Sequence, residues 1–388
     1  MKKILLLGFI IIGLTALGQG PNQAVLDSII RLSERTNSNA LLIYKDNQLV
    51  YSNYFDNDVQ PIEAMSASKS IVSLAVGLLV DKGFIKSIDE PVYTLYPEWK
   101  QGNKKFITIR HLLNHTSGLQ NVPNAGIEIE VSPDVIQLAL CAELESYPGE
   151  KFSYNNKASN LLAGIVEKAS GLAMDKFLDK FLFSPMGIRN FSWVTDKAGN
   201  PLGMSGFQVL PEDLARIGHM VMNKGQWEGK QLVSEDWITQ MVAPAEAGSN
   251  YGFEWWLMYE GQALVIDDDF LLPLKPSVDS TAYLLLQKLS GRYEGGMNEL
   301  RGKAMGIYNR EELGSVAKVL ASIPEGKMKL VNSGKVIGYV ARGYLGQNLI
   351  IIPGKQLVVV RMITAENFRK VPNNSQFGQL EHLVKELY

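Results

Sequence analysis

The sequence predicts an α+β fold, in which one antiparallel sheet built from both ends of the chain is flanked by helices and interrupted by a mostly helical region. Strand patterns occur at residues 41–55 and again at residues 335–363. Between them, residues 89–257 have the periodicity of helices and loops. Because the strands need each other to form a sheet, the simplest arrangement packs the helices on that sheet.

The composition is that of a globular protein without a highly charged partner. The 388 residues are 46% hydrophobic and 20% charged, with a formal net charge of −2, and the chain is long enough for a large core. This charge gives no support for nucleic acid or an anionic membrane as a partner. Cys141 is the single cysteine, so no disulfide forms within the chain. Phosphate-loop and dinucleotide glycine patterns are missing, and we expect no cofactor.

Residues 1–18 have the pattern of a signal peptide. Lys2 and Lys3 provide a positive end, and residues 4–17 form an apolar stretch that is short for a bilayer span. Ala16 and Gly18 are the small residues of a cleavage site. We expect an exported protein, periplasmic or secreted, with an uncleaved N-terminal anchor as the alternative. No later segment reaches transmembrane length, so no membrane span is expected after signal removal.

A single domain is expected over residues 23–388. It begins with a helix at 23–36 and continues with a two-stranded hairpin around a turn at Asp46 and Asn47. An apolar helix then ends at Gly83, because glycine is a common helix stop.

The C-terminal strands complete the predicted sheet. One strand runs to Tyr344, and two more cover residues 348–352 and 356–363, joined by a tight turn at 353–355. A final helix at 376–387 closes the chain.

Ser66 and Lys69 form a Ser-x-x-Lys pattern at the start of the apolar helix. Residues three apart on a helix share a face, so the lysine can reach the serine hydroxyl. A helix start favours an anion that develops there, and a buried lysine can lose its charge and accept a proton. The pattern alone is weak, since it occurs by chance about once in a chain of this length. Ser315 and Lys318 repeat it in another helical stretch.

Tyr154 and Asn156 form a Tyr-x-Asn triplet in a loop before a second apolar helix. The tyrosine could share a proton with Lys69, and the asparagine could hold the lysine or hydrogen-bond a substrate amide. Tyr51 and Asn53 form the same triplet in the early hairpin. There we expect the tyrosine to pack on a strand.

Gly343 and Tyr344 lie at the end of the first C-terminal strand. A glycine in a strand lets another backbone approach closely. The N–H of Tyr344 could then join the N–H of Ser66 in binding an oxyanion. The alternative is an edge-strand glycine with no ligand.

His111 and His115 stand four apart, a spacing that can bind zinc on a helix. The residues between them lack the glutamate of a metallohydrolase, and no third ligand is apparent. We therefore expect no metal and assign both histidines to packing or turns. A Gly-x-Ser-x-Gly elbow is also missing, which excludes an α/β-hydrolase.

In this order, the three patterns resemble those of the serine β-lactamase-related family, which includes class C β-lactamases, DD-peptidases and related esterases and amidases. The resemblance covers residues 24–259 and 336–388, and it extends to four longer phrases: ITIRHLLNHTSGL, YPGEKFSYNN, VLPEDLARIGHMVMNKGQWEGKQLVSEDWI and YGFEWWL. It implies a β-lactamase/transpeptidase-like fold and a covalent acyl-enzyme mechanism.

The resemblance also implies a role for each residue of the three patterns. Ser66 attacks a carbonyl, while Lys69 and Tyr154 move the proton. The N–H groups of Ser66 and Tyr344 hold the oxyanion, and water releases the acyl group. Asn156 orients the lysine or the substrate.

The third motif departs from the family pattern. β-Lactamases and many peptidases of the family carry Lys-Thr-Gly there, and the lysine meets a substrate carboxylate. This chain has Ala341, Arg342 and Gly343 instead, and strand alternation should point Arg342 to the opposite face. An ester or amide without that carboxylate is therefore easier to fit than a penicillin or a D-Ala-D-Ala peptide.

A long helical insertion, at about 259–335, is the second departure. Residues 279–323 within it predict two or three helices. The insertion enters just before the motif strand, so it could form a lid or wall over the pocket, or it could be a peripheral addition. Of the neighbouring Trp255 and Trp256, strand alternation allows only one to line a pocket.

These observations predict an exported serine hydrolase that acts through Ser66 as an esterase or amidase on a small-molecule substrate. A DD-peptidase or β-lactamase is the alternative within the same class. A non-catalytic ligand-binding protein on the same fold is the alternative from another class. The presence of Ser66, Lys69 and Tyr154 together argues against it, because a binding protein has no need of all three.

Overall fold

The computed structural model describes residues 20–56, 58–122, 124–246, 249–323, 328–371 and 377–388. The signal peptide predicted at 1–18 lies outside the described residues. The chain forms two compact units. The first contains the described residues up to Ala245, Tyr251–Trp256 and Gly338–Tyr388, and the second contains Glu246–Asn250 and Leu257–Ile337. The stretch 259–335, where an insertion is expected, falls within the second unit.

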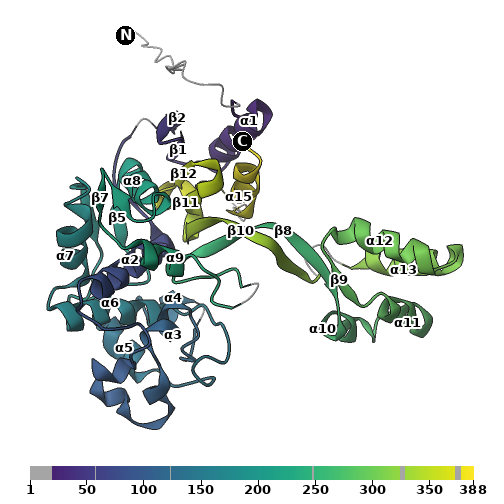
Figure 1. Cartoon of the computed structure of the whole chain (residues 1–388), viewed down its shortest axis with the longest axis horizontal. Coiled ribbons are helices and arrows are strands. Elements are labelled where there is room, and N and C mark those ends of the chain that lie inside the picture. Colours follow the sequence, from purple (N-terminus) through teal and green to yellow (C-terminus); the bar gives the residue numbers. More distant parts are fainter. Residues whose placement is uncertain (1–19, 57, 123, 247–248, 324–327, 372–376) are drawn as a thin grey trace, which may run out of the picture. The chain divides into compact units, whose positions relative to one another are not determined.

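A seven-stranded sheet joins strands from both ends of the chain, as the sequence predicts (Figure 1). The strand order is β2–β1–β12–β11–β10–β8–β9. Strand β1 pairs antiparallel with β2 and β12, and β11 pairs antiparallel with β10 and β12. The strands are β1 Ala40–Lys45, β2 Gln48–Tyr54, β8 Trp256–Ile266, β9 Gly291–Tyr293, β10 Leu330–Gly343, β11 Gln347–Ile352 and β12 Leu357–Met362.

The predicted first hairpin is confirmed, with Asp46 and Asn47 between its two strands. Their φ angles are 52° and 60°, in the left-handed region that asparagine and aspartate tolerate better than other residues with a side chain. Two-residue turns with positive φ at both positions match the twist of the flanking strands.

Strands β11 and β12 are buried over their whole length, because helices cover both faces of the sheet. On one face, α8 (Pro211–Met222) packs against both strands. On the other, α1 (Gln23–Arg35) and α15 (Phe377–Lys385) lie side by side (Figure 1). Arg361 of β12 belongs to this second face, since it donates a 2.8 Å hydrogen bond to Ser38, just beyond α1.

Two buried helices carry the predicted site. Helix α2 (Ser68–Asp81) packs on α6 (Asn156–Ser170), and α2 is buried from Ser68 to Leu79. A helix buried on all sides is apolar on all sides, which explains its nearly continuous hydrophobic sequence. It is a core helix of 14 residues, and within the described part of the chain no helix has the length and apolar character needed to cross a membrane.

Smaller elements complete the first unit. The further α-helices are α3 Ile109–Leu113, α4 Ala125–Glu128, α5 Val135–Cys141, α7 Met174–Leu178, α9 Glu235–Met241 and α14 Ala365–Arg369. Five short strands, β3 Ile62–Glu63, β4 Phe191–Trp193, β5 Phe207–Val209, β6 Gln226–Trp227 and β7 Lys230–Gln231, form two small sheets. These strands were not predicted from the sequence, because segments of two or three residues carry no detectable alternation.

The second unit has a core of its own, in which Leu286, Tyr293 and Leu300 are buried together. Its helices are α10 Asp268–Leu271, α11 Ser280–Lys288, α12 Gly296–Ile307 and α13 Arg310–Ser322, and the last three are the helices predicted at 279–323. Strand β9 and parts of β8 and β10 also belong to this unit, so part of the sheet lies in it.

The close contact between α8 and the sheet predicts an asymmetry between two Gly→Ala substitutions. A Cβ on Gly218 would lie 2.6 Å from Leu349 Cδ1 and 2.9 Å from Val358 Cγ1. We expect Gly218→Ala to lower the free energy of unfolding by about 1–2 kcal/mol, since overpacking outweighs the better helix propensity of alanine. Chemical denaturation measures the change.

Gly302→Ala is the matched control, because Gly302 lies inside α12 with no atom within 4 Å of an added Cβ. It should raise stability by up to ~1 kcal/mol. Equal stabilisation by both substitutions would contradict the packing of α8 described here.

Candidate active site

Ser66 lies in a short 3-10 helix, Met65–Ala67, which leads directly into α2. The preceding Met65 has a φ of 50°, a left-handed conformation that is uncommon for a residue with a side chain. Met65 opens the 3-10 helix, so Ser66 lies at the positive end of the helix dipole. The local sequence thus places a hydroxyl group where a developing anion is favoured.

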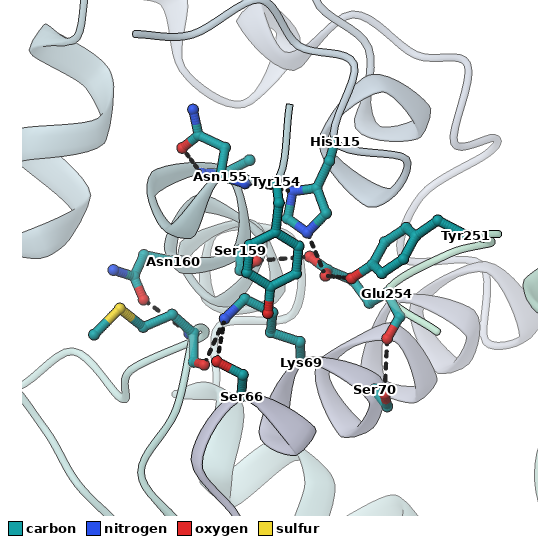
Figure 2. A network of polar contacts seen from close by, with 12 residues as sticks. Ser66, Lys69, Ser70, His115, Tyr154, Asn155, Ser159, Asn160, Tyr251 and Glu254 are labelled. Atoms are coloured by element: carbon teal, nitrogen blue, oxygen red, sulfur yellow. Dashed lines mark hydrogen bonds and ion pairs between the residues drawn. The ribbon is translucent and has the colours of Figure 1, made fainter. Parts of the chain in front are cut away.

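Lys69 points at Ser66 from one helical turn away (Figure 2). Its Nζ lies 3.1 Å from Ser66 Oγ and donates a 2.8 Å hydrogen bond to the carbonyl of Met204. Lys69 is 1% exposed. Burial lowers the pKa of Lys69 to about 7, and the charge of Glu254 opposes this shift. Near neutral pH, a large fraction of the amine is therefore uncharged and able to accept a proton.

Tyr154 completes the group of three (Figure 2). Its hydroxyl hydrogen-bonds the Ser66 side chain, and Lys69 Nζ lies 5.0 Å from its ring centroid. Burial raises the pKa of Tyr154 well above its usual value; the Ser66 hydrogen bond and the charge of Arg342 oppose this shift, and Glu254 adds to it. Tyr154 thus keeps its proton at neutral pH, so it can donate or relay a proton, whereas Lys69 is the group that can take one up.

The two asparagines after Tyr154 have different environments. Asn155 is 1% exposed and caps α6, with its Oδ1 accepting from the N–H groups of Lys157 and Ala158 at 2.9 and 3.3 Å. Asn156, the predicted site residue, is the first residue of α6, and its Oδ1 is buried without a hydrogen-bond partner in the described chain. Asn156 was predicted to orient either Lys69 or a substrate. Lys69 is held by the Met204 carbonyl, so contact with a substrate stays the prediction for Asn156.

The Met204 carbonyl was not predicted from the sequence. It accepts the hydrogen bond from Lys69, while the N–H of Met204 donates at 3.0 Å to Asn160 Oδ1 on α6. Asn160 is fully buried, so it holds the carbonyl in place. A backbone acceptor carries no residue-type signal, which is why no pattern indicated it.

Gly343 fits the close approach expected of it. A Cβ at this position would lie 2.2 Å from the carbonyl oxygen of Ala64 and 3.1 Å from the N of Ala67, which flank the Ser66 segment. The Tyr344 side chain is 65% exposed and its ring contacts Phe368 at 5.6 Å. Any role of Tyr344 near Ser66 therefore belongs to its backbone, as the oxyanion prediction assumes.

The two side chains of the third motif that precede Gly343 have different environments. Ala341 is fully buried, while Arg342 donates two 2.8 Å hydrogen bonds to Glu381 of α15. The Arg342 guanidinium also lies 4.7 Å over the Trp256 ring, which stacks on Tyr154 at 5.8 Å. The positive charge of Arg342 therefore lies near Tyr154, but Arg342 is hydrogen-bonded to the carboxylate of Glu381.

The neighbouring tryptophans divide as expected. Trp255 is fully buried, whereas Trp256 stacks on Tyr154. Trp255 directly precedes β8 and Trp256 is its first residue, so one indole reaches the site and the other lies in the core.

Three further buried residues lie behind Tyr154 (Figure 2). Glu254 lies 2.9 Å from His115 Nε2 and accepts a 2.9 Å hydrogen bond from Tyr251. All three belong to phrases of the sequence that match the family, but no role was predicted for Glu254 or Tyr251. His115 was assigned to packing or a turn, and its φ of 55° does place it in a turn.

His111 does not join His115. Its Nδ1 accepts from the N–H of Thr108 at 3.2 Å in the capping box of α3, which confirms a structural role. Among the described residues, no group of three or more histidine, cysteine, aspartate or glutamate side chains could hold a metal ion.

The repeated patterns belong to other elements of the fold. Ser315 is in α13, where its Oγ donates to the carbonyl of Glu311 at 3.2 Å, and Lys318 is exposed. Tyr51 lies in strand β2. The same short patterns thus produce a buried site at one place and surface structure at the other.

A comparison with protein-family models identifies the chain. The model described as Beta-lactamase matches residues 26–377. The chain belongs to the Beta-lactamase family. This confirms the resemblance based on Ser66, Tyr154 and Gly343, and the solved structures that it matches confirm the predicted fold. One of them, a penicillin-binding protein from Bacillus halodurans, has a TM-score of 0.54 at 16% identity, over 88% of this chain and 98% of that chain.

Several curated family members are similar in sequence. Penicillin-binding protein 4* of Bacillus subtilis (strain 168) is 34% identical over 42% of this chain and 40% of its own length. The 6-aminohexanoate-dimer hydrolase of Paenarthrobacter ureafaciens is 24% identical over 57% and 61%. Esterase EstB of Burkholderia gladioli is 31% identical over 34% and 38%. The matched parts thus span about half the length of these relatives.

The contact of Gly343 with the Ser66 segment can be tested by substitution. In Gly343→Ala, the added Cβ would displace the backbone of Ala64 and Ala67 and move Ser66 between them. We expect the labelling of Ser66 by a fluorophosphonate to slow by about a hundredfold, as for a displacement of about 1 Å at a reacting centre. Intact-mass spectrometry over time measures the rate.

Gly354→Ala serves as the control. Gly354 lies between β11 and β12, and an added Cβ there has no atom within 4 Å. Its labelling rate should equal that of the unmodified chain. A normal rate for Gly343→Ala would contradict the proposed tight fit against Ser66.

Proposed function

We propose that this member of the Beta-lactamase family is a serine hydrolase that forms an acyl-enzyme at Ser66 and acts as an esterase or amidase on a small substrate. The observation that carries the proposal is the 3.1 Å contact between Lys69 Nζ and Ser66 Oγ in a buried setting. A base with its pKa near the working pH, in contact with a hydroxyl, is the arrangement that activates a serine nucleophile.

Acylation follows from the positions of three groups. Ser66 Oγ attacks the carbonyl carbon of the substrate, and its proton passes to the uncharged amine of Lys69. The carbonyl oxygen becomes an oxyanion, for which we propose the N–H groups of Ser66 and Tyr344 as donors. When the bond to the leaving group breaks, the leaving oxygen or nitrogen takes a proton that Tyr154 delivers, and Lys69 restores the proton of Tyr154.

Deacylation reverses the roles. A water molecule attacks the acyl carbon, and its proton passes through the same two groups to Ser66 Oγ as the ester bond to the serine breaks. The proton balance closes, because Lys69 and Tyr154 end in their starting states. Tyr154 suits relay rather than permanent ionisation, since burial raises its pKa.

The third motif supports an ester or amide without the carboxylate of a penicillin. Ala341 provides no cation, and Arg342 is engaged by Glu381. Relatives named an esterase and a dimer hydrolase are consistent with such substrates. A relative named penicillin-binding protein keeps a DD-peptidase or β-lactamase as the second candidate.

Intact-mass spectrometry after incubation with a fluorophosphonate and, separately, with a penicillin tests the proposal. We expect a fluorophosphonate adduct on the unmodified chain and none on Ser66→Ala, because the hydroxyl is the nucleophile. Ser315→Ala is the matched control, because it removes the serine of the second Ser-x-x-Lys pattern, which lies in α13. This variant should label normally.

The outcomes separate the candidates. Labelling by the fluorophosphonate alone supports the esterase or amidase, and acylation by both compounds favours the peptidase or β-lactamase. If folded protein forms no adduct with either compound, the proposal of a hydrolase is wrong and a ligand-binding protein takes its place.

The pH dependence of labelling tests Lys69 as the base. Only the uncharged amine accepts a proton, so the rate should rise with pH up to about 7 and level off above it, following the pKa of Lys69. Lys69→Arg keeps a charge that arginine does not lose in this range, and we expect labelling to fall by ~10²–10⁴-fold at every pH. A flat profile for the unmodified chain would exclude Lys69 as the base.

A further inference from the structure

Glu254 is a buried carboxylate that the acyl-transfer steps above do not use. It is 1% exposed and lies between Tyr251 and Trp256 with a φ of 59°. Its Oε1 accepts a 2.8 Å hydrogen bond from Ser159 Oγ, and its Oε2 accepts one of 2.9 Å from Tyr251. Buried carboxylates are costly unless each oxygen has a donor, and the chain provides donors from two separate segments.

The third neighbour of this carboxylate is His115, whose Nε2 lies 2.9 Å from Glu254 Oε2 (Figure 2). The other ring nitrogen, Nδ1, accepts from the N–H of Asn155 at 3.2 Å. In a neutral imidazole, one nitrogen accepts and the other carries the proton. Nδ1 is the acceptor, so Nε2 carries the proton and faces the carboxylate.

His115 holds the backbone on both sides of Tyr154. Its carbonyl accepts from the N–H of Ser153 at 2.8 Å, and its ring accepts from Asn155. The ring itself packs on Tyr154 with centroids 4.7 Å apart. A histidine in the other tautomer would present an N–H to the N–H of Asn155, and this support of Tyr154 would be lost.

The backbone of Glu254 is fixed as firmly as its side chain. Its carbonyl accepts a 2.7 Å hydrogen bond from Ser70 on α2, and its N–H donates to Leu113 at 3.1 Å. Ser70 is the residue after Lys69, so the helix that carries the base also holds the carboxylate.

From this geometry, we propose that Glu254 and His115 form a positioning pair that holds Tyr154 beside Lys69 and sets the charge balance at Ser66. The proposal rests on the function proposed above. Neither residue touches the substrate: His115 acts through the backbone and ring of Tyr154, and Glu254 acts through His115 and through its charge.

The charged and titratable groups around Glu254 determine the direction of the electrostatic effect. They are His115 from the turn after α3, Lys69 from α2, Tyr154 from the segment before α6, Tyr251 from the segment before β8, and Arg342 from β10. The negative charge of Glu254 stabilises protonated Lys69 and so raises its pKa against the larger effect of burial. Removing the charge must therefore lower the pKa of Lys69.

Glu254→Gln tests the pair, because it removes the charge and keeps the shape of the side chain. Its single oxygen can take the place of Oε2 beside His115 and Tyr251, and its NH2 group then donates to Ser159 Oγ. We expect the rise of Ser66 labelling with pH to move to lower pH. A shift of half a pKa unit below about 7 increases the ratio of the rates at pH 6 and pH 8 by about 2.5-fold. The plateau rate at high pH should also fall, since a neutral amide holds the imidazole less firmly than a charged carboxylate does. A structural role alone would lower the plateau without moving the rise.

Asp213→Asn is the matched control. Asp213 is also a buried carboxylate, 4% exposed, and its partner is Arg216 on the same helix α8. Its labelling profile should coincide with that of the unmodified chain. If the unmodified chain labels and Glu254→Gln shows an unmoved rise, the positioning pair is overturned while the proposed function stands; if the unmodified chain never labels, both fail.

The tautomer of His115 gives a second measurement that needs no folded Glu254 variant. The chain has four histidines, and nitrogen-15 NMR distinguishes their tautomers, with His115→Gln identifying the signal. We expect the neutral tautomer protonated at Nε2. Protonation at Nδ1 would overturn the positioning role of the pair.

Discussion

The burial of Lys69 is the constraint on which the site depends. Removing an ammonium group from water costs several kcal/mol unless partners compensate. Here the nitrogen contacts one hydroxyl and one carbonyl, and Glu254 contributes through its charge. This environment stabilises the ammonium ion only partly, so the charged and uncharged forms lie close in free energy near neutral pH. The buried packing of α2 and α6 serves this balance, since a more open site would return the amine to its usual basicity.

The backbone around this lysine is strained at several points. Met65, His115, Glu254 and Leu345 all have positive φ angles, between 50° and 71°, and such conformations cost about 1–3 kcal/mol each. Met65 precedes Ser66, and His115 supports Tyr154. Glu254 is the buried carboxylate, and Leu345 follows the third motif. The hydrogen bonds and packing of the first unit compensate for this strain, which concentrates where the polar groups must be aimed.

Part of this arrangement could be predicted from the sequence, and the reasons for the rest are physical. The three-residue spacing on a helix brings Lys69 to Ser66, and the alternation along a strand separates Ala341 from Arg342. The Met204 carbonyl has no residue-type signature. The hydrogen bond between Ser159 and Glu254 joins residues 95 positions apart, which no local pattern can reveal. For the fold, the helices and strands near the two ends of the chain were found, whereas the short strands of the first unit and the 11-residue strand β8 were not predicted.

The ion pair between Arg342 and Glu381 ties the last helix of the chain to the strand that carries Gly343. Lys355, in the turn between β11 and β12, also donates to the carbonyls of Lys385 and Tyr388. The C-terminus is therefore fastened to the part of the sheet that flanks the nucleophile. Loss of the last helix would thus disturb the geometry around Ser66, which lies hundreds of residues earlier in the chain, and a purification tag attached directly after α15 would carry the same risk.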